Sequence, residues 1–205
     1  HTHVLSRWGL SDILPPNVRM IHGPGCPVCV LPIGRIDQAI ELALEHRVIL
    51  ATYADTMRVP ASRGRSLFQC RAAGGDVRMV YSPSDALKLA RENPDREVVF
   101  FAIGFETTTP PTAAVVKQAE AENLTNFTVF CSHVLTPAAM EHILLTAPSR
   151  PDAPVLDGLV GPAHVSTVIG SNPYLPFAEK WGKPVVVAGF EPLDMLMAIE
   201  MLVRQ

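Results

Sequence analysis

The sequence predicts an α/β protein with parallel sheets, because short apolar runs alternate with amphipathic stretches along most of the chain. Runs without a polar alternation are typical of strands covered on both faces. The stretches between them carry apolar residues at helical spacing, and several are bounded by proline. This order favours βαβ units and a parallel sheet with helices on both faces.

Six apolar runs are predicted as buried strands, at 48–53, 77–81, 98–103, 127–131, 155–160 and 185–188, with 18–21 as a weaker candidate. Helices are predicted at 36–45, 67–73, 85–92, 113–122, 138–146 and 193–203. The helix near residue 85 has the clearest start. Ser82 supplies an N-cap hydroxyl, Pro83 suits the first helical position, and Asp85 places a carboxylate in the first turn.

A short internal repeat indicates two domains. Gly104-Phe105-Glu106 and Gly189-Phe190-Glu191 each follow an apolar strand and precede a helix. Duplication of an α/β half explains this shared context, while the alternative is two unrelated tight turns that use glycine's permissive backbone. We therefore expect two similar parallel-sheet domains, 1–111 with the cysteine motif and 112–205, with a cleft between them.

Composition points to a folded, soluble protein. Hydrophobic residues make up 48% and charged residues 18% of the 205 residues, as in ordinary globular chains. No run is long enough for a membrane span, no signal peptide is recognisable, and a net charge of −3 gives no footprint for nucleic acid. Four cysteines fit a reducing compartment, so we expect a cytoplasmic protein. The chain starts at His1 without methionine, which suggests a fragment.

Polar residues follow four of the predicted strands: Asp55, Thr56 and Arg58; Glu106, Thr107 and Thr108; Cys131, Ser132 and His133; and His164 and Ser166. The carboxyl ends of parallel strands meet at one edge of a sheet, where ligands bind. These four segments could therefore converge on one cleft.

Each candidate also has a structural alternative. Asp55 and Arg58 could form a local ion pair, and Glu106, Thr107 and Thr108 could cap a helix. His133 and His164 are better candidates than His46 and His142, which are expected on helix surfaces. Cys70 is expected in the core, and Cys131 is expected to pack at the end of a buried strand.

The segment His22-Gly23-Pro24-Gly25-Cys26-Pro27-Val28-Cys29 is the most informative motif. Its glycines and prolines predict a shaped loop, and Cys26 before Pro27 suits an N-cap that favours the thiolate. Two thiolates could hold iron or zinc temporarily, or could work as a redox pair. A closed zinc site needs four ligands, and Cys70 and Cys131 lack matching spacing. His1, His3 and His22 could add nitrogen ligands.

A larger set of motifs resembles the HypD family of hydrogenase maturation factors over the whole chain. The motifs are His1-Thr2-His3, the run 23–32 (GPGCPVCVLP), Asp55 with 57–60 (MRVP), 81–83 (YSP), 104–108 (GFETT), 164–166 (HVS) and 189–194 (GFEPLD). The resemblance implies two α/β domains of thioredoxin-like character. It also implies a scaffold that works with HypC, holds iron, and receives cyanide through HypE and HypF together with carbon monoxide. The finished Fe(CN)2CO unit then passes to the hydrogenase large subunit.

The resemblance also assigns residue roles. Cys26 and Cys29 match the family's central CxxC, and His1 matches the first histidine of its CGGHTH motif, so these three are the expected iron ligands. Glu106, Thr107 and His164 match motif positions expected to act with the two cysteines. Asp55, Arg58 and Thr108 are expected to bind the iron unit beside His1.

The sequence departs from the family pattern in three places. The cysteine that opens the CGGHTH motif is missing, and so is the C-terminal region expected to hold a [4Fe–4S] cluster. Ala163 stands before His164 where the family usually has glycine, a mild change unless that backbone needs a positive φ.

The residues alone leave three functions possible. The first is the iron scaffold with redox ability. The alternative is a thioredoxin-like thiol–disulfide oxidoreductase that uses Cys26 and Cys29. The third is an α/β enzyme that uses Asp55, Glu106 and His133 for acid–base work.

Overall fold

The computed structural model describes residues 1–23, 25–149 and 151–205. The chain forms two compact units. Unit 2 is continuous and contains Cys26–Val134, whereas unit 1 combines His1–Gly25 with Leu135–Gln205. Each unit is described by itself.

Unit 2 is built on a parallel sheet with the strand order β2-β1-β3-β4. The strands are β1 (Ile49–Thr52), β2 (Val77–Met79), β3 (Val98–Gly104) and β4 (Phe127–His133). β3 lies centrally and pairs with β1 on one side and with all of β4 on the other. The parallel sheet predicted from alternating strands and helices is thereby confirmed.

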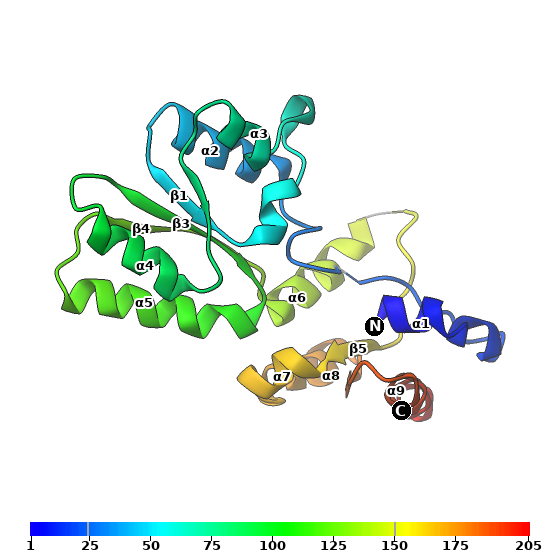
Figure 1. The fold of residues 1–205 in the computed structure, drawn as a ribbon. Helices are drawn as coiled ribbons and strands as arrows, with labels where there is room; N and C mark the ends of the chain where they lie inside the picture. Colours follow the sequence, from blue (N-terminus) through cyan, green and yellow to red (C-terminus); the bar gives the residue numbers. More distant parts are fainter. Residues whose placement is uncertain (24, 150) are drawn as a thin grey trace. The chain divides into compact units, whose positions relative to one another are not determined.

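Helices cover both faces of this sheet, as Figure 1 shows: α2 (Ile33–Leu44) and α3 (Leu67–Ala72) on one face, α4 (Pro83–Glu92) and α5 (Thr109–Ala121) on the other. Alternate residues of β3 pack into the two cores on opposite faces of the sheet. Phe101 packs with α2 and α3, while Phe100 packs with α4 and α5. A central strand buried on both faces therefore needs an unbroken apolar run. The start of α4 is as predicted, because Ser82 and Asp85 form a capping box.

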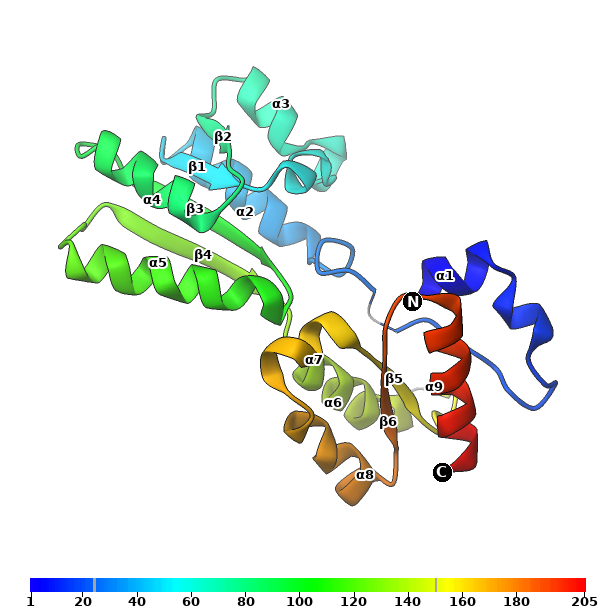
Figure 2. The same ribbon diagram turned by 60° about the horizontal axis from the view of Figure 1, so that its bottom comes forward.

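Unit 1 has a smaller parallel sheet of β5 (Leu159–Pro162) and β6 (Val185–Ala188). One core joins Val4 and Leu10 to β6 and to α9 (Pro192–Arg204), and the second joins α6 (Thr136–Thr146) to α8 (Leu175–Trp181). Figure 2 shows α1 (Thr2–Arg7) beside α9. α7 (Ala163–Ile169) follows β5 directly. The 3₁₀ helices are η1 (Leu10–Ile13), η2 (Ala54–Arg58), η3 (Ser62–Gly64), η4 (Glu106–Thr108), η5 (Ala147–Ser149) and η6 (Asn172–Tyr174).

Two strand predictions need correction. Residues 18–21 form no strand. The strand predicted at 155–160 begins later, at Leu159. Val155 is 83% exposed, so it has no buried face of the kind that favours a strand at this point of the chain.

The two units also divide the chain differently from the boundary expected at residue 111. β4 pairs with the full length of β3, so residues beyond 111 complete the sheet of unit 2. The first 25 residues belong with the C-terminal part instead, because Val4 and Leu10 pack against β6 and α9.

Within the described residues, no helix has the length and apolar character needed to cross a membrane.

Candidate functional site

The strand order places a topological switch point between β1 and β3 in unit 2. After β1 the chain passes to α3 on one face, and after β3 it passes to α5 on the opposite face. Connections that diverge in this way leave a crevice at the carboxyl ends of the two strands, the usual ligand position in open α/β sheets. The segments after β1 and β3 are therefore the first candidates for a site.

The segment after β1 forms the short helix η2. Asp55 is exposed, and its Oδ1 accepts a hydrogen bond of 2.9 Å from the amide of the buried Thr56. Burial, together with the nearby Asp55 charge, raises the pKa of Tyr53. The guanidinium of Arg58 lies 5.9 Å from the ring centre of Phe68.

The ion pairs of the described residues include neither Asp55 nor Arg58. The alternative that these two residues merely pair with each other is therefore wrong. Arg58 is an exposed cation at the carboxyl edge of the sheet.

The segment after β3 turns sharply into η4 and α5. Glu106 is 5% exposed, and Thr107 beside it is exposed. Thr108 takes the N-cap position of α5, although its hydroxyl donates backwards to the carbonyl oxygen of Phe105 at 2.9 Å. A Cβ on Gly104 would lie 1.9 Å from Oγ1 of Thr108. Glycine is thus required for Thr108 to fold back onto the end of the strand.

The end of β4 carries a thiol–imidazole pair. Sγ of Cys131 lies 3.3 Å from Nδ1 of His133. Cys131 is a free, exposed cysteine, so the prediction that it packs at the end of a buried strand is wrong. β4 is the outermost strand of the described sheet, which explains the exposure. Burial lowers the pKa of His133.

The cysteine motif forms one hydrogen-bonded turn before α2. The amides of Cys29 and Val30 donate to the carbonyl oxygen of Cys26 at 3.0 and 3.2 Å, and the Cys29 amide also lies 3.1 Å from Sγ of Cys26. The sulfurs of Cys26 and Cys29 are joined in a disulfide. Cys26 is half-buried and Cys29 exposed. The predicted shaped loop is confirmed, whereas Pro24 lies outside the described residues.

This turn lies at the same sheet edge as the segments after β1 and β3. Val28, at its centre, packs against a core that includes Met57 of η2, which follows β1, and Ile103 near the carboxyl end of β3. Arg35, in the first turn of α2, lies 5.0 Å from the ring centre of Phe130. Both views show the segment before α2 at the tips of the strand arrows (Figures 1 and 2). Unit 2 therefore gathers the disulfide, Asp55, Arg58 and Glu106 at one edge.

In unit 1 the predicted His1 and His164 meet around one aromatic ring. The ring centre of Phe190 lies 5.1 Å from that of His1 and 5.3 Å from that of His164. Nε2 of His1 donates to the carbonyl oxygen of Ala188 at 3.0 Å. Phe190 belongs to the second Gly-Phe-Glu motif, so the repeat contributes a contact residue that sequence reasoning did not single out.

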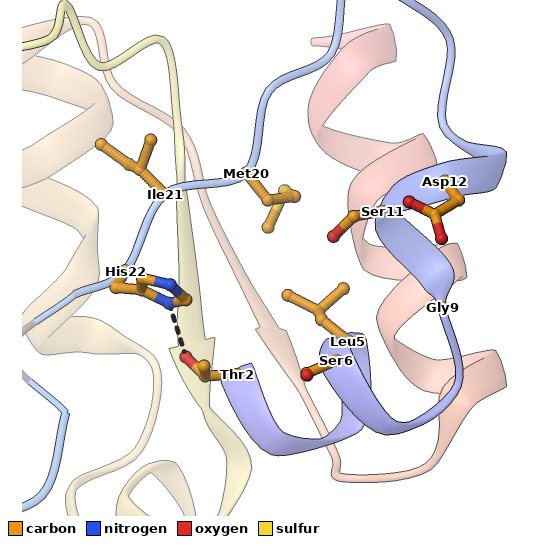
Figure 3. Close-up of a pocket in the computed structure, with 9 residues that line it drawn as sticks. All are labelled: Thr2, Leu5, Ser6, Gly9, Ser11, Asp12, Met20, Ile21 and His22. Atoms are coloured by element: carbon orange, nitrogen blue, oxygen red, sulfur yellow. Dashed lines mark hydrogen bonds between the residues drawn. The ribbon is translucent and has the colours of Figure 1, made fainter.

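His22 borders a separate hollow of unit 1 with a volume of about 420 Å³. Its Nδ1 lies 3.1 Å from the hydroxyl of Thr2 (Figure 3). The lining is mixed, and comprises Thr2, Leu5, Ser6, Gly9, Ser11, Asp12, Met20, Ile21 and His22. Of the expected nitrogen ligands, only His22 lines it.

The structure bears on two expectations, the backbone conformation before His164 and the grouping of metal ligands. Ala163 begins α7 and is not among the positive-φ residues, so alanine before His164 costs nothing there. Among the described residues, no three side chains of histidine, cysteine, aspartate or glutamate are grouped as a metal-binding cluster. Iron binding by Cys26, Cys29 and His1 thus stays a prediction.

Sequence reasoning missed the Cys131–His133 pair and Phe190. The spacing of Cys131 and His133 could have revealed the first, because alternate residues of a strand share a face. Phe190 gave no such signal, since its two histidine neighbours are distant in sequence. Cys70, by contrast, is 3% exposed and packs in the core as predicted.

Comparison with known proteins identifies a family that matches the whole chain. The HypD family model, described as "Hydrogenase formation hypA family", matches residues 1–205. The hydrogenase maturation factor HypD of Azotobacter vinelandii is 65% identical over 205 residues, which cover all of this chain and 54% of the relative. The proteins of the same name from Cupriavidus necator and Escherichia coli K12 are 63% and 52% identical, with 54% and 53% of their lengths covered. The chain spans about half the length of the curated relatives it matches.

Proposed function

The chain belongs to the HypD family, and from this membership we propose that it is part of a hydrogenase maturation factor. In this proposal the protein works in the cytoplasm as a scaffold with HypC, on which the Fe(CN)2CO unit of [NiFe] hydrogenases is assembled. HypE, with HypF, supplies the cyanide. The hydrogenase large subunit receives the finished unit, and a [4Fe–4S] cluster belongs to a C-terminal region outside this sequence.

The observation that carries the proposal is the Cys26–Cys29 turn at the ligand-binding edge of unit 2. In the reduced state of this turn, Cys26 and Cys29 would hold Fe(II) through two thiolates, and each thiol would release its proton to solvent. Soft sulfur donors suit an iron that carries strong-field ligands. The amide of Cys29, 3.1 Å from Sγ of Cys26, can stabilise a thiolate at that position.

Other residues that match the family motifs have complementary tasks in this proposal. Exposed Arg58 offers hydrogen-bond donors to a cyanide nitrogen, and His164 in unit 1 is a second candidate donor. Buried Glu106 can accept or hold a proton where thiols are deprotonated. His1, held against Ala188 and Phe190, is the candidate nitrogen ligand.

The test replaces both Cys26 and Cys29 by Ala in the protein extended to the length of its relatives. Loss of the two sulfur ligands should abolish hydrogenase maturation, measured as hydrogenase activity in a strain that lacks its own factor. Cys70→Ala is the matched control, because Cys70 is a buried thiol outside the CxxC motif, beside the carbonyl oxygen of Ile40, and its loss should leave maturation largely intact. Normal maturation by the double variant would refute the assigned roles.

The disulfide itself favours one second candidate, a thiol–disulfide oxidoreductase that uses Cys26 and Cys29. Infrared spectra of protein purified anaerobically with HypC separate the two functions. Cyanide and carbonyl stretches support the scaffold. Disulfide reductase turnover without such bands supports the oxidoreductase.

A further inference from the structure

The end of β4 carries a cysteine and a histidine, two residue types that bind metals, and the proposed function uses neither. Cys131 and His133 are alternate residues of a strand and therefore point to the same side of the sheet. Sγ of Cys131 lies 3.3 Å from Nδ1 of His133. Cys131 is exposed, so a solute can reach its sulfur from solvent.

We propose that Cys131 and His133 form a two-ligand binding site for a borderline-soft divalent cation, of the class that includes Fe²⁺, Co²⁺ and Zn²⁺. This inference stands independently of the proposed function. The donors are a thiolate and an imidazole nitrogen, the two ligand types that these cations share.

The spacing of the donors suits one bound cation. Zinc–sulfur bonds of about 2.3 Å and zinc–nitrogen bonds of about 2.0 Å, at a tetrahedral angle, hold the two donor atoms roughly 3.5 Å apart. The observed 3.3 Å needs only a small adjustment. Chelation at Cys131 and His133 therefore requires no movement of the backbone.

The imidazole has one nitrogen suited to this role. Nε2 of His133 is shielded from solvent and has no hydrogen-bond partner within the part of the chain that the structure describes. Nδ1, in contrast, faces the exposed thiol. A cation that reaches the ring must therefore bind it through Nδ1, on the side where Cys131 provides the second ligand.

A site with two protein ligands leaves the other coordination positions to water or to small anions. On binding, the thiol of Cys131 loses its proton to solvent and the sulfur bonds to the cation. Such a site should bind weakly and exchange its metal readily, since closed structural sites have four protein ligands. β3 and β4 pair His133 with Gly104, so the site adjoins the start of the Gly-Phe-Glu turn.

The experiment is a titration of the intact chain with Co²⁺ under anaerobic conditions without reductant. With Cys26 and Cys29 oxidised and Cys70 buried, Cys131 is the accessible thiol. We expect a sulfur-to-cobalt charge-transfer band that saturates at one equivalent. Cys131→Ala should abolish the band, and His133→Asn should weaken binding at least tenfold.

Two controls make the result decisive. His46→Gln removes an exposed histidine that follows α2, at the opposite edge of the sheet, and should leave the titration unchanged. A Cys26→Ser, Cys29→Ser double variant should retain the band, which separates this site from the proposed scaffold site. Absence of the band in the wild-type chain, or its persistence in Cys131→Ala, would overturn the proposal and leave the pair as a hydrogen bond only.

Discussion

At the scale of single residues, the two Gly-Phe-Glu turns share a packing device. A Cβ on Gly104 would lie 1.9 Å from Oγ1 of Thr108, and a Cβ on Gly189 would lie 2.1 Å from Oδ2 of Asp194. In each turn a polar side chain from the following helical segment occupies the space that a glycine leaves at the end of a strand. The repeat is therefore present in the structure as well as in the sequence.

Gly104→Ala should lower the free energy of unfolding by about 1–3 kcal/mol, the usual range for overpacking. Rotation of the Thr108 side chain cannot relieve the steric clash, because its Cβ and Cγ2 would also lie 2.9 Å from the new Cβ. Urea denaturation measures the loss.

The matched control is Gly34→Ala near the start of α2, where a new Cβ meets nothing within 4 Å. It should be neutral or slightly stabilising. Thr108→Ala should relieve part of the Gly104→Ala defect. Equal stability of the wild-type and Gly104→Ala proteins would contradict the close packing.

Residue roles were only partly foreseeable from the sequence. The buried position of Cys70 and the shaped cysteine turn followed from apolar patterning and from glycine and proline. The exposure of Cys131 did not, because it depends on β4 being the outermost strand, and strand order is a long-range property. The contact of His1 and His164 with Phe190 likewise joins segments that no local pattern connects.

At the scale of elements, one carboxylate links the starts of β2 and β3, the two strands on either side of β1. Asp76 accepts two hydrogen bonds from Arg78, at 2.8 and 2.9 Å, and a third from Arg96 at 2.7 Å. Asp76 and Arg96 lie just before β2 and β3. Hydrogen bonding by Arg78, followed by that of Arg96, holds the pKa of Asp76 below its ordinary value.

This depressed pKa predicts a pH dependence. Because the folded-state pKa lies below the unfolded value of about 4, the contribution of Asp76 is complete above that value. It is lost as the pH falls through the folded pKa. Asp76→Asn should therefore cost about 1 kcal/mol at pH 7 for this partly exposed pair.

Urea denaturation of the wild-type and Asp76→Asn proteins over a series of pH values measures the difference between them. The gap should narrow as the solution is acidified below about pH 4. Asp152→Asn, at an exposed position of unit 1, is the control and should show no such trend. A gap that does not change with pH would refute the assignment.

Buried strands and a clearly capped helix were predictable, whereas several short helices were not. The strands predicted at 98–103 and 185–188 and the capped start of α4 followed from apolar runs and cap residues. Helices of six or seven residues hold few apolar positions, so α3 was predicted whereas α1, α7 and α8 were missed. At residues 18–21, by contrast, a strand was predicted and is absent, because an apolar run without a partner strand forms no sheet.

At the scale of the whole molecule, both cores of unit 2 consist of its own residues. We expect the fragment 26–134 to fold alone, with a cooperative thermal transition in circular dichroism. The fragment 1–111 is the control. It lacks β4 and most of α5, so one of the two partner strands of β3 is gone, and it should not melt cooperatively. An unfolded 26–134 fragment would contradict the independence of unit 2.

The interrupted course of unit 1 has a consequence for biosynthesis. Unit 2 is one continuous stretch, so it can fold on the ribosome as soon as it has left the exit tunnel. Val4 and Leu10 cannot pack into their core until β6 and α9 have been translated, and both of these elements follow unit 2 in the sequence. The segment that holds Val4 and Leu10 is thus made before unit 2 but finds its partners only after unit 2 is complete, and a chaperone that shields this segment would act in that interval.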